Sequence, residues 1–490
     1  MKRILFINPP VVCVNECQLG WYSFAHPTSI LKLIAWHRLQ GNEPAFIDCM
    51  DYDGGSTPGT AETRKNTVIT EPGANIPRSG SGNLSQKKTS IAEPSADIHR
   101  SDNDNRSQNN ITITEPVADK PAWQSQPYKK LPLGSSRLRL YIDTHILGKT
   151  MHWLEGELKK QTTPDEIWVS CHMTFNNELA HETIRTAKRV FPEAVIRLGG
   201  NYATLFPEEA QSKSGASVFK GLFAGAELLF PDYSLFQGPL DYMVFQLDLG
   251  CDNHCSHCVN SLLHQEIIRL NVPALVQDLK LKKERYGVSH FVNIDPNVAC
   301  FDLQDFLQEC IHQKLDASLY FYGGIQPDKV TPELASIMHE AGVRGLTLPR
   351  ELETDSNRQL QKSYSPGSFY NAVDSFQKAG FDLSDFHCSF PVGFMDDNLI
   401  ELTTIIREIR DMGAIPEIAP VAFVPGTPEY RRHAPLLHGK TLVELNWALW
   451  PALDSTDAIT THAILYNAAH GNRFNKPWSL KSAVRDHRNE

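Results

Sequence analysis

The sequence predicts an α/β protein: an N-terminal doubly wound parallel sheet, then six further βα units, then a short helical C-terminal region. Short apolar stretches alternate with stretches of helical periodicity up to about residue 200, and the alternation restarts at Asp241 and runs six times. This alternation is typical of parallel sheets whose strands are joined by helices. Because 490 residues are too many for one ordinary core, we expect domains at 1–235, 236–430 and 431–490.

The elements of the first domain lie on both sides of an interruption in the globular pattern. The expected strands are 3–8, 45–49, 166–171 and 194–198. The expected helices are 26–40, 148–160 and 178–190. In the first of these helices Ile30, Leu31 and Ile34 follow helical spacing, and Gly41 provides the stop signal. Strands and helices in this order predict the doubly wound sheet.

Residues 60–127 interrupt this domain with a stretch rich in Ser, Thr, Asn, Asp, Gly and Pro and poor in large apolar residues. Glu-Pro pairs that begin at Glu71, Glu93 and Glu115 recur every 22 residues. Solenoid repeats have periods in this range, but these units lack the leucines that would build a stacked face. We therefore expect a disordered insertion, with a partner-binding arm as the alternative.

The second domain is expected to contain six strands, at 243–249, 290–294, 319–322, 345–348, 386–390 and 417–423. The helices between them are expected at 273–286, 303–314, 332–341, 367–379 and 398–412. Six βα units with right-handed crossovers predict an open, partial relative of the eight-stranded barrel. Active sites of such barrels lie at the carboxyl ends of the strands. In the C-terminal region we expect helices at 441–453 and 458–469.

Composition excludes several classes of function. The formal net charge is −10 and no basic patch runs through the sequence, so we expect no nucleic-acid partner. No apolar stretch approaches the roughly 20 residues that span a bilayer, and residues 1–10 resemble a strand and turn rather than a signal peptide. We therefore expect a cytoplasmic protein whose cysteines stay reduced, so that clustered cysteines indicate a metal rather than disulfides.

Cys251, Cys255 and Cys258 form such a cluster, with Cys-x3-Cys-x2-Cys spacing, where the expected strand 243–249 ends. A [4Fe–4S] cluster is normally held by four thiolates. Three on one loop would leave one iron open to a small molecule. The alternatives are zinc, bound with His254 or His257, and unliganded thiols. Zinc motifs usually pair two such elements a dozen or more residues apart, and the sequence has no second pair.

The cysteine spacing resembles the radical S-adenosylmethionine (SAM) superfamily. The chain outside the insertion resembles its cobalamin (B12)-binding-domain branch, through Asn8-Pro9-Pro10 and the stretches 198–210 and 425–430. This resemblance implies a flavodoxin-like, B12-binding sheet followed by a partial (βα)6 radical SAM barrel. It also implies that the three cysteines bind a [4Fe–4S] cluster whose open iron binds SAM, with an electron donor such as flavodoxin or ferredoxin.

The resemblance also implies positions for cobalamin. Ser170 begins a Ser-Cys-His run where the family has Ser-x-Leu, and Gly199 and Gly200 follow as the family's Gly-Gly pair. Lacking Cβ, these glycines would let the tail of the cofactor approach the backbone; an ordinary tight turn is the alternative. Residues 9–24 contain no histidine to bind cobalt. His145 matches the family pattern Asp-x-His-x-x-Gly, but it follows the insertion, and we interpret it mainly as a loop residue.

Two carboxylates are candidate SAM contacts. Asp295 replaces the family's Gly-Gly-Glu after the second barrel strand and would accept from the SAM ammonium, or else cap a turn. Glu351 stands where the family has a glutamate after the fourth strand; the alternative is a solvated carboxylate or one paired with Arg350. The sequence assigns no catalytic acid, base or radical quencher, and Cys300, Cys310 and Cys388 are interpreted as core thiols.

The sequence thus predicts a radical SAM iron–sulfur enzyme that uses cobalamin and generates a 5′-deoxyadenosyl radical. It would modify an unactivated carbon of a small-molecule substrate, and methylation, a transferase reaction, is one outcome that cobalamin allows. The first alternative is a radical SAM enzyme with a degenerate B12 domain that catalyses cyclisation, rearrangement or oxidation. The second is a zinc-stabilised binding protein that recruits partners through the repeats.

Overall fold

A computed structural model describes residues 1–14, 26–50, 126–135, 140–237, 240–264, 266–298, 303–350, 352 and 365–470. Residues 1–55 and 111–490 belong to one compact unit. The insertion expected at 60–127 lies outside the described residues except at its end, where Gln126 begins a strand, so that boundary was wrong. The domain boundaries near residues 235 and 430 stay predictions. No helix in the described ranges is long and apolar enough to cross a membrane.

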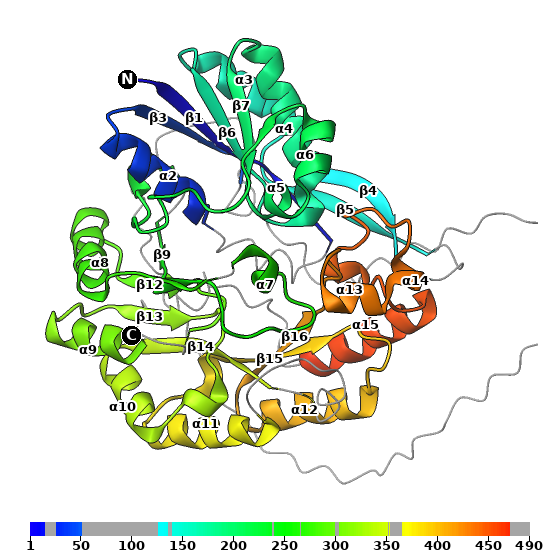
Figure 1. Ribbon diagram of the computed structural model, residues 1–490. Helices are drawn as coiled ribbons and strands as arrows, with labels where there is room; N and C mark the ends of the chain where they lie inside the picture. Colours follow the sequence, from blue (N-terminus) through cyan, green and yellow to red (C-terminus); the bar gives the residue numbers. More distant parts are fainter. Residues whose placement is uncertain are drawn as a thin grey trace, which may run out of the picture. The chain divides into compact units, whose positions relative to one another are not determined.

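The N-terminal region contains a five-stranded sheet in the order β3-β1-β6-β7-β8, with every neighbouring pair parallel (Figure 1). The strands are β1 (Arg3–Asn8), β3 (Glu43–Asp48), β6 (Glu166–Ser170), β7 (Val195–Gly199) and β8 (Ser217–Val218). The helices are α2 (Thr28–Leu39), α3 (Met151–Lys160), α4 (Asn177–Val190), α5 (Asn201–Leu205) and α6 (Pro207–Ser214). The parallel sheet expected here is confirmed.

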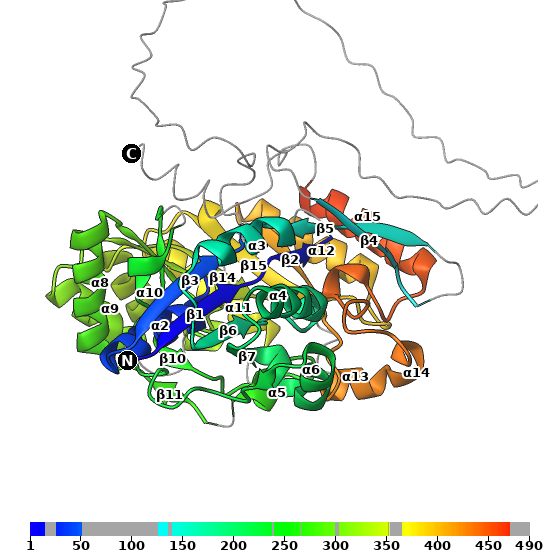
Figure 2. The ribbon, with the colours of Figure 1, turned by 90° about the horizontal axis from the view of Figure 1, so that it is seen from above.

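Alternation along β1 explains why helices cover both faces of this sheet. Ile4 and Phe6 belong to a core cluster that includes the buried side chains of α2. Leu5 and Ile7 belong to a second cluster, with buried side chains of α3 and α4. Because successive side chains of a strand point to opposite faces, this division places α2 on one face and α3 and α4 on the other, and the sheet is doubly wound (Figure 2).

A second, antiparallel sheet was not expected. Its strands, in the order β2-β5-β4, are β2 (Val11–Cys13), β5 (Tyr141–Leu147) and β4 (Gln126–Pro132). His145 lies within β5 and pairs with Cys13 of β2, so its interpretation as a loop residue was wrong. The physical reason is that β5 is ordered by pairing with β4 and with β2, and β2 lies far away in the sequence, so that local periodicity does not reveal this pairing.

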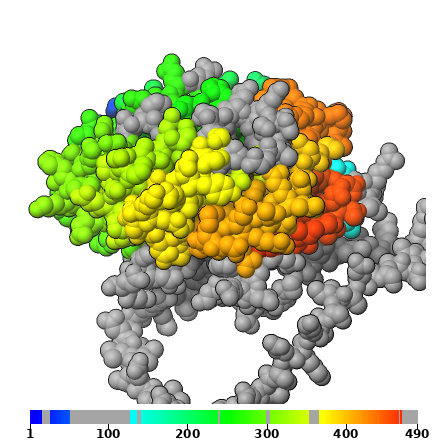
Figure 3. Space-filling model, turned by 90° about the horizontal axis from the view of Figure 1, so that it is seen from below, coloured from blue at the N-terminus to red at the C-terminus, as the bar shows by residue number. Residues whose placement is uncertain are grey.

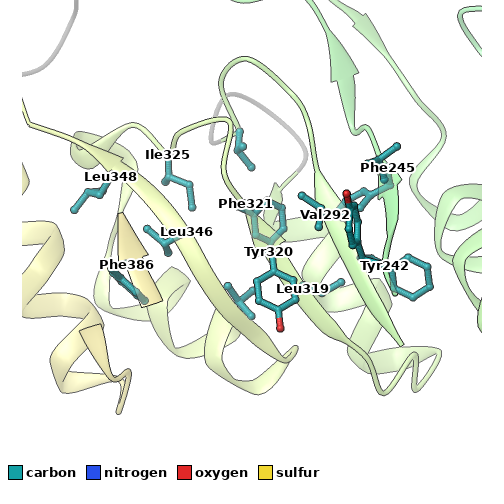
Figure 4. Close-up of a cluster of buried hydrophobic side chains, with 14 of the residues drawn as sticks. Tyr242, Phe245, Val292, Leu319, Tyr320, Phe321, Ile325, Leu346, Leu348 and Phe386 are labelled. Atoms are coloured by element: carbon teal, nitrogen blue, oxygen red, sulfur yellow. The ribbon is translucent and has the colours of Figure 1, made fainter. Parts of the chain in front are cut away.

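The second half of the chain contains six parallel strands in the order β16-β15-β14-β13-β12-β9, as expected. They are β9 (Met243–Phe245), β12 (His290–Asn293), β13 (Ser318–Phe321), β14 (Val343–Pro349), β15 (Phe386–Val392) and β16 (Ile415–Pro420). Their side chains build a continuous apolar core in which Phe245, Val292, Phe321, Leu346 and Phe386 come from neighbouring strands (Figure 4).

Five helices connect these strands, at the positions that the sequence predicted. They are α8 (Val272–Tyr286), α9 (Leu303–His312), α10 (Pro332–Glu340), α11 (Pro366–Lys378) and α12 (Leu399–Asp411). Thr331 caps α10 by accepting a hydrogen bond from the Leu334 amide, and Pro332 occupies the first turn. Figure 3 shows the face that carries α10, α11 and α12, and the colours pass across it in sequence order, from green through yellow to orange.

Several predicted strands differ in extent, and two of them are instructive. The strand expected at 243–249 ends at Phe245, because the Leu247 amide donates to the Asp295 carboxylate rather than to a strand carbonyl. Residues 248 and 249 then form a separate strand. The last strand begins two residues before its expected start, so it includes Pro416. Proline is tolerated there because β16 lies at the edge of the sheet.

The prediction of a helix at 441–453 was wrong. The Asn446 side chain accepts from the Ala448 amide and begins a 3-10 turn (Trp447–Leu449), and Trp450 follows with φ +52°. Both features end a regular helix. The helix expected at 458–469 is confirmed within α15 (Ser455–His470). Other short elements of the described chain are η1 (Thr174–Asn176), η2 (Tyr233–Leu235), η3 (Pro327–Lys329), η5 (Leu383–Asp385), α13 (Pro428–Arg432) and α14 (Ala434–Leu437).

Candidate functional site

The three cysteines lie on one loop closed by a small antiparallel hairpin. Strand β10 (Asp248–Leu249) pairs with β11 (Ile268–Arg269), so residues 250–267 form the connection between them. Gly250 opens the loop with φ +111°, and a Cβ there would lie 3.0 Å from the Glu266 carbonyl oxygen. Glycine is therefore required where the loop leaves β10.

Hydrogen bonds within the loop hold the cysteines in a compact turn. The Cys258 amide donates to the Cys255 carbonyl at 3.0 Å, and the Asn253 amide donates to Cys251 Sγ at 3.4 Å. All three cysteines are half-buried. Burial raises the pKa of the Cys251 thiol and the nearby Cys258 adds to this, whereas the Asn253 amide and the Asn297 side chain oppose it. Such hydrogen bonds to sulfur are what iron–sulfur thiolates accept.

Side chains from the next two barrel strands hold the start of the cysteine loop. Asn297, after β12, donates from Nδ2 to Asp252 Oδ1 at 3.1 Å, and Gln326, after β13, donates from Nε2 to the same oxygen at 3.3 Å. Both donors follow the carboxyl end of a parallel strand. The cysteine loop is therefore fixed at the end of the barrel where active sites of this architecture form.

Asp295 binds the segment that leads into the hairpin of the cysteine loop. Its side chain is fully buried, and Oδ2 accepts from the Leu247 amide and from Asn293 Nδ2, each at 2.8 Å. Burial raises the pKa of Asp295 to about 8, and the charge of Asp248 adds to the effect. Oδ1 has no partner among the described residues. Asp295 thus fixes the turn into the hairpin and keeps one oxygen for a further donor.

A cavity of about 640 Å³ is lined by the cysteine loop itself and by Arg269 of β11. This volume falls in the range of roughly 300–1,000 Å³ that small-molecule sites occupy. Its wall carries both charge signs and two imidazoles, since it is lined by Cys251, Asp252, His254, Ser261, His264, Glu266, Ile267 and Arg269. Burial lowers the pKa of His264, so this imidazole is neutral at pH 7. A polar or zwitterionic ligand suits such a wall.

Ser170, Gly199 and Gly200 lie together at the carboxyl edge of the N-terminal sheet. Ser170 pairs with Gly199 in register, and the Cys171 amide donates to the Gly199 carbonyl at 3.0 Å. Gly200 has φ +94°, and a Cβ there would lie 2.5 Å from the Cys171 carbonyl oxygen, so the chain's own packing requires this glycine. A Cβ on Gly199 would meet nothing within 4 Å. Only Gly199 therefore has open space for a ligand.

Helix packing brings this sheet edge next to the cysteine loop. Helix α5, which begins directly after Gly200, packs against α7 (Asn260–Leu263), which begins two residues after Cys258. The two groups of candidate residues, predicted separately, thus belong to adjoining parts of the molecule. His145 lies instead in the antiparallel sheet, and Glu351 lies outside the described residues.

Several residues that hold the loop were not assigned a role from the sequence. Asn297 and Gln326 bind Asp252, and Glu429 binds Ser256 between the second and third cysteines. For Glu429 a signal existed, because the stretch 425–430 was singled out as matching the family. In the described part of the chain, no three His, Cys, Asp or Glu side chains converge on a point that could hold a single metal ion. The cysteines of a cubane need not converge in this way, since each binds its own iron.

Neither the protein-family models nor the curated proteins searched gave a match. Among solved structures, the radical S-adenosylmethionine methyltransferase TsrM from Kitasatospora setae, with tryptophan substrate and aza-SAM bound, matches with a TM-score of 0.57 and 11% identity over 90% of this chain and 77% of that chain. A second structure of that enzyme, with cobalamin and a [4Fe-4S] cluster bound, gives a TM-score of 0.54 and 11% identity over 89% and 78%. The chain therefore shares the fold of this methyltransferase along most of its length.

Proposed function

We propose that this chain is a cobalamin-dependent radical SAM enzyme that modifies, and most simply methylates, a carbon of a small-molecule substrate. The observation that carries the proposal is the Cys-x3-Cys-x2-Cys loop, fixed at the carboxyl end of a six-stranded parallel barrel beside a cavity of about 640 Å³. The shared fold with a methyltransferase solved with a [4Fe-4S] cluster and cobalamin supports it.

Cys251, Cys255 and Cys258 are proposed as the cluster ligands. They fit this role because one short loop carries all three and because backbone and side-chain donors surround Cys251. When bound, the cluster would supply the electron that cleaves SAM to a 5′-deoxyadenosyl radical. The chain's own contribution is to hold three thiolates in fixed positions and to leave the fourth position for SAM. An external electron donor, such as flavodoxin or ferredoxin, is part of the proposal.

The cavity beside the loop is proposed as the site for SAM and substrate. Arg269 suits a carboxylate and Glu266 suits an ammonium group, so the wall can orient a zwitterion. Asp295 contributes one buried oxygen, Oδ1, to the same end of the barrel, and its proposed role is to accept from the SAM ammonium. We propose Glu351 as a second SAM contact on the strength of its position in the sequence alone.

Cobalamin is proposed to bind at the carboxyl edge of the N-terminal sheet. Ser170, Gly199 and Gly200 lie together there, and the open space at Gly199 would admit the tail of the cofactor. The packing of α5 against α7, which joins this edge to the cysteine loop, supports a proposal in which both cofactors act on one substrate. Bound cobalamin would supply a methyl group, and the chain's part is to fix its distance from the cluster.

The deciding experiment is anaerobic purification of the full chain with iron, sulfide and hydroxocobalamin supplied, followed by assay of Fe, S, Co and 5′-deoxyadenosine. We expect about one four-iron cluster and one cobalamin per chain, and reductant-dependent cleavage of SAM. Iron and sulfide well below one cluster per chain, or zinc without sulfide, would overturn the proposal.

A second candidate is a radical SAM enzyme whose sheet does not bind cobalamin, and which catalyses cyclisation, rearrangement or oxidation. The observation in its favour is that packing against Cys171 accounts for Gly200 without any ligand. Cluster and SAM cleavage in the same assay, with no cobalt retained after desalting, would select this candidate over the first.

A further inference from the structure

A buried glutamate contacts the cysteine loop between its second and third cysteines. Glu429 lies in α13, after the last barrel strand, and is 0% exposed. Its backbone amide donates to the Ser256 carbonyl at 3.0 Å, and its Oε2 accepts from Ser256 Oγ at 3.0 Å. Two hydrogen bonds thus join a single glutamate to the one buried residue of the segment that carries the three cysteines.

The other carboxylate oxygen of Glu429 is also engaged. Oε1 lies 3.0 Å from His433 Nε2 and 3.3 Å from Arg432 Nη1. Burial alone would raise the pKa of Glu429, but hydrogen bonds from His433 and Ser256 and the charge of Arg432 outweigh it, so the pKa lies below its ordinary value. The carboxylate is therefore ionised at neutral pH, and its bond to Ser256 is of the stronger, charge-assisted kind.

Two further contacts show that the loop rests on fixed elements. A Cβ on Gly426, three residues before Glu429, would lie 3.4 Å from Leu262 Cδ1, so this segment also touches α7. On the side of β15, the His257 ring meets the ring of buried Phe394 edge to face, with centroids 6.1 Å apart. Glu429 is the charged member of this support and the one that reaches between two cysteines.

We propose that Glu429 is a positioning residue for the cluster, acting through Ser256 to hold Cys255 and Cys258 in the orientation in which they share a cluster with Cys251. The inference rests on the proposed function. Groups that hydrogen-bond to metal ligands fix ligand orientation, and their loss typically costs about 10–100-fold in metal affinity. Glu429 would act in this way through Ser256, the residue next to Cys255. An ionised carboxylate next to the loop would also affect the cluster's reduction potential through its charge.

The test compares two variants of the full chain with a matched control. Ser256→Ala removes the side-chain bond and leaves the glutamate in place, and Glu429→Gln keeps the shape and removes the charge. Glu166→Gln is the control, because Glu166 is also a buried carboxylate with a lowered pKa, bound by Lys2 at 2.7 Å and Arg197 at 2.9 Å, but on the N-terminal sheet. Each protein is reconstituted anaerobically with iron and sulfide and then challenged with an iron chelator.

We expect Ser256→Ala and Glu429→Gln to take up iron and sulfide but to lose them about 10–100-fold faster than the wild type. We also expect a changed electron paramagnetic resonance spectrum of the reduced cluster. The control should lower the melting temperature without altering either measurement, which separates positioning from general stabilisation. Wild-type retention and an unchanged spectrum in Ser256→Ala would overturn the inference even if Glu429→Gln fails to fold. Absence of a cluster in the wild type would instead overturn the proposed function.

Discussion

The cysteine loop and the carboxyl edge of the N-terminal sheet are held in different ways. Around the loop, buried polar side chains come from three distant segments: Asp295 from the connection after β12, Gln326 from the connection after β13, and Glu429 from α13. At the sheet edge, Gly199 and Gly200 lie mainly against the backbone of β6 and of Cys171, and the Gly200 carbonyl also accepts from the Thr204 hydroxyl of α5. Buried polar groups are costly unless each is satisfied, so such a network around the loop indicates that its exact geometry is needed.

The difference bears on the two cofactors. Side chains from several distant segments hold the loop, which supports the proposal of a cluster there. Packing accounts for the conformation of Gly200 at the sheet edge. The proposal that cobalamin binds there therefore depends on the open space at Gly199 and on the shared fold. Substitutions at the two places should therefore have different effects.

Cys255→Ala should abolish the cluster and SAM cleavage, because a cluster held by three thiolates does not survive the loss of one. The measurements are iron and sulfide content, visible absorbance and 5′-deoxyadenosine formation. Cys310→Ala is the matched control, since Cys310 is a buried thiol on α9, and it should retain a full cluster. Equal iron and sulfide in the two variants would refute the assignment of Cys255.

The sheet edge is tested by a pair of neighbouring glycines. Gly200→Ala should destabilise the protein by roughly 2–4 kcal/mol, because φ is +94° and the new Cβ would meet the Cys171 carbonyl at 2.5 Å. Gly199→Ala should leave the free energy of unfolding nearly unchanged, as nothing lies within 4 Å of its Cβ. Chemical denaturation measures both.

Gly199→Ala then tests cobalamin separately from stability. If the tail of the cofactor passes over Gly199, the added methyl group should weaken cobalamin binding at least about tenfold, a loss of about 1.4 kcal/mol. Equilibrium titration followed by cobalamin absorbance provides the measurement. Unchanged affinity, with a stable protein, would remove the main structural support for cobalamin at this edge.

How far the site could be predicted from sequence depends on how local its determinants are. The cysteine triplet was found because its spacing lies within eight residues, and the barrel was found because each βα unit has its own periodicity and stop signals. Ser256 and Glu429 are 173 residues apart, so neither carries a signal of the other. Asp295 was named as a SAM contact, and the structure adds that it also ends β9 through the Leu247 amide.

Non-local contacts and side-chain contacts also explain why two predictions of secondary structure were wrong. Strand β5 is ordered by pairing with β2 and β4, and a long stretch of chain separates it from β2. The segment 441–453 has apolar residues at helical spacing, but Asn446 turns it into a 3-10 element by binding a backbone amide nearby. In both cases a tertiary or side-chain contact outweighs local propensity.

Asp295→Asn should change how stability depends on pH. The pKa of Asp295 is raised to about 8, first by burial and then by Asp248, whereas an unfolded aspartate titrates near about 4. Between these values the folded state binds the extra proton, so the carboxyl's contribution to stability is present below about pH 4 and declines as pH rises to about 8. The variant removes this decline, of at most about 1.4 kcal/mol per pH unit.

Thermal denaturation from pH 4.5 to 8 measures the effect. Asp316→Asn is the control, since the Asp316 side chain is 95% exposed, and it should leave the pH profile of the wild type intact. A profile that stays parallel to the wild type in Asp295→Asn would show that Asp295 is ionised in the folded protein. The buried oxygen would then be a charged one, and the account of how the loop is supported would need a cation beside it.

The smallest effect is expected for His145→Ala. His145 lies in the middle of β5, paired with Cys13, and its neighbour Thr144 is fixed by hydrogen bonds between its hydroxyl and the Lys129 backbone. None of these contacts joins it to Ser170 or Gly199, so the substitution should leave cobalamin affinity unchanged. The electron paramagnetic resonance spectrum of the bound cob(II)alamin should likewise be the same in variant and wild type. A nitrogen splitting present in the wild type and absent from the variant would make His145 the cobalt ligand. The antiparallel sheet would then belong to the cofactor site, and the sheet edge, like the cysteine loop, would depend on a side chain from a distant segment.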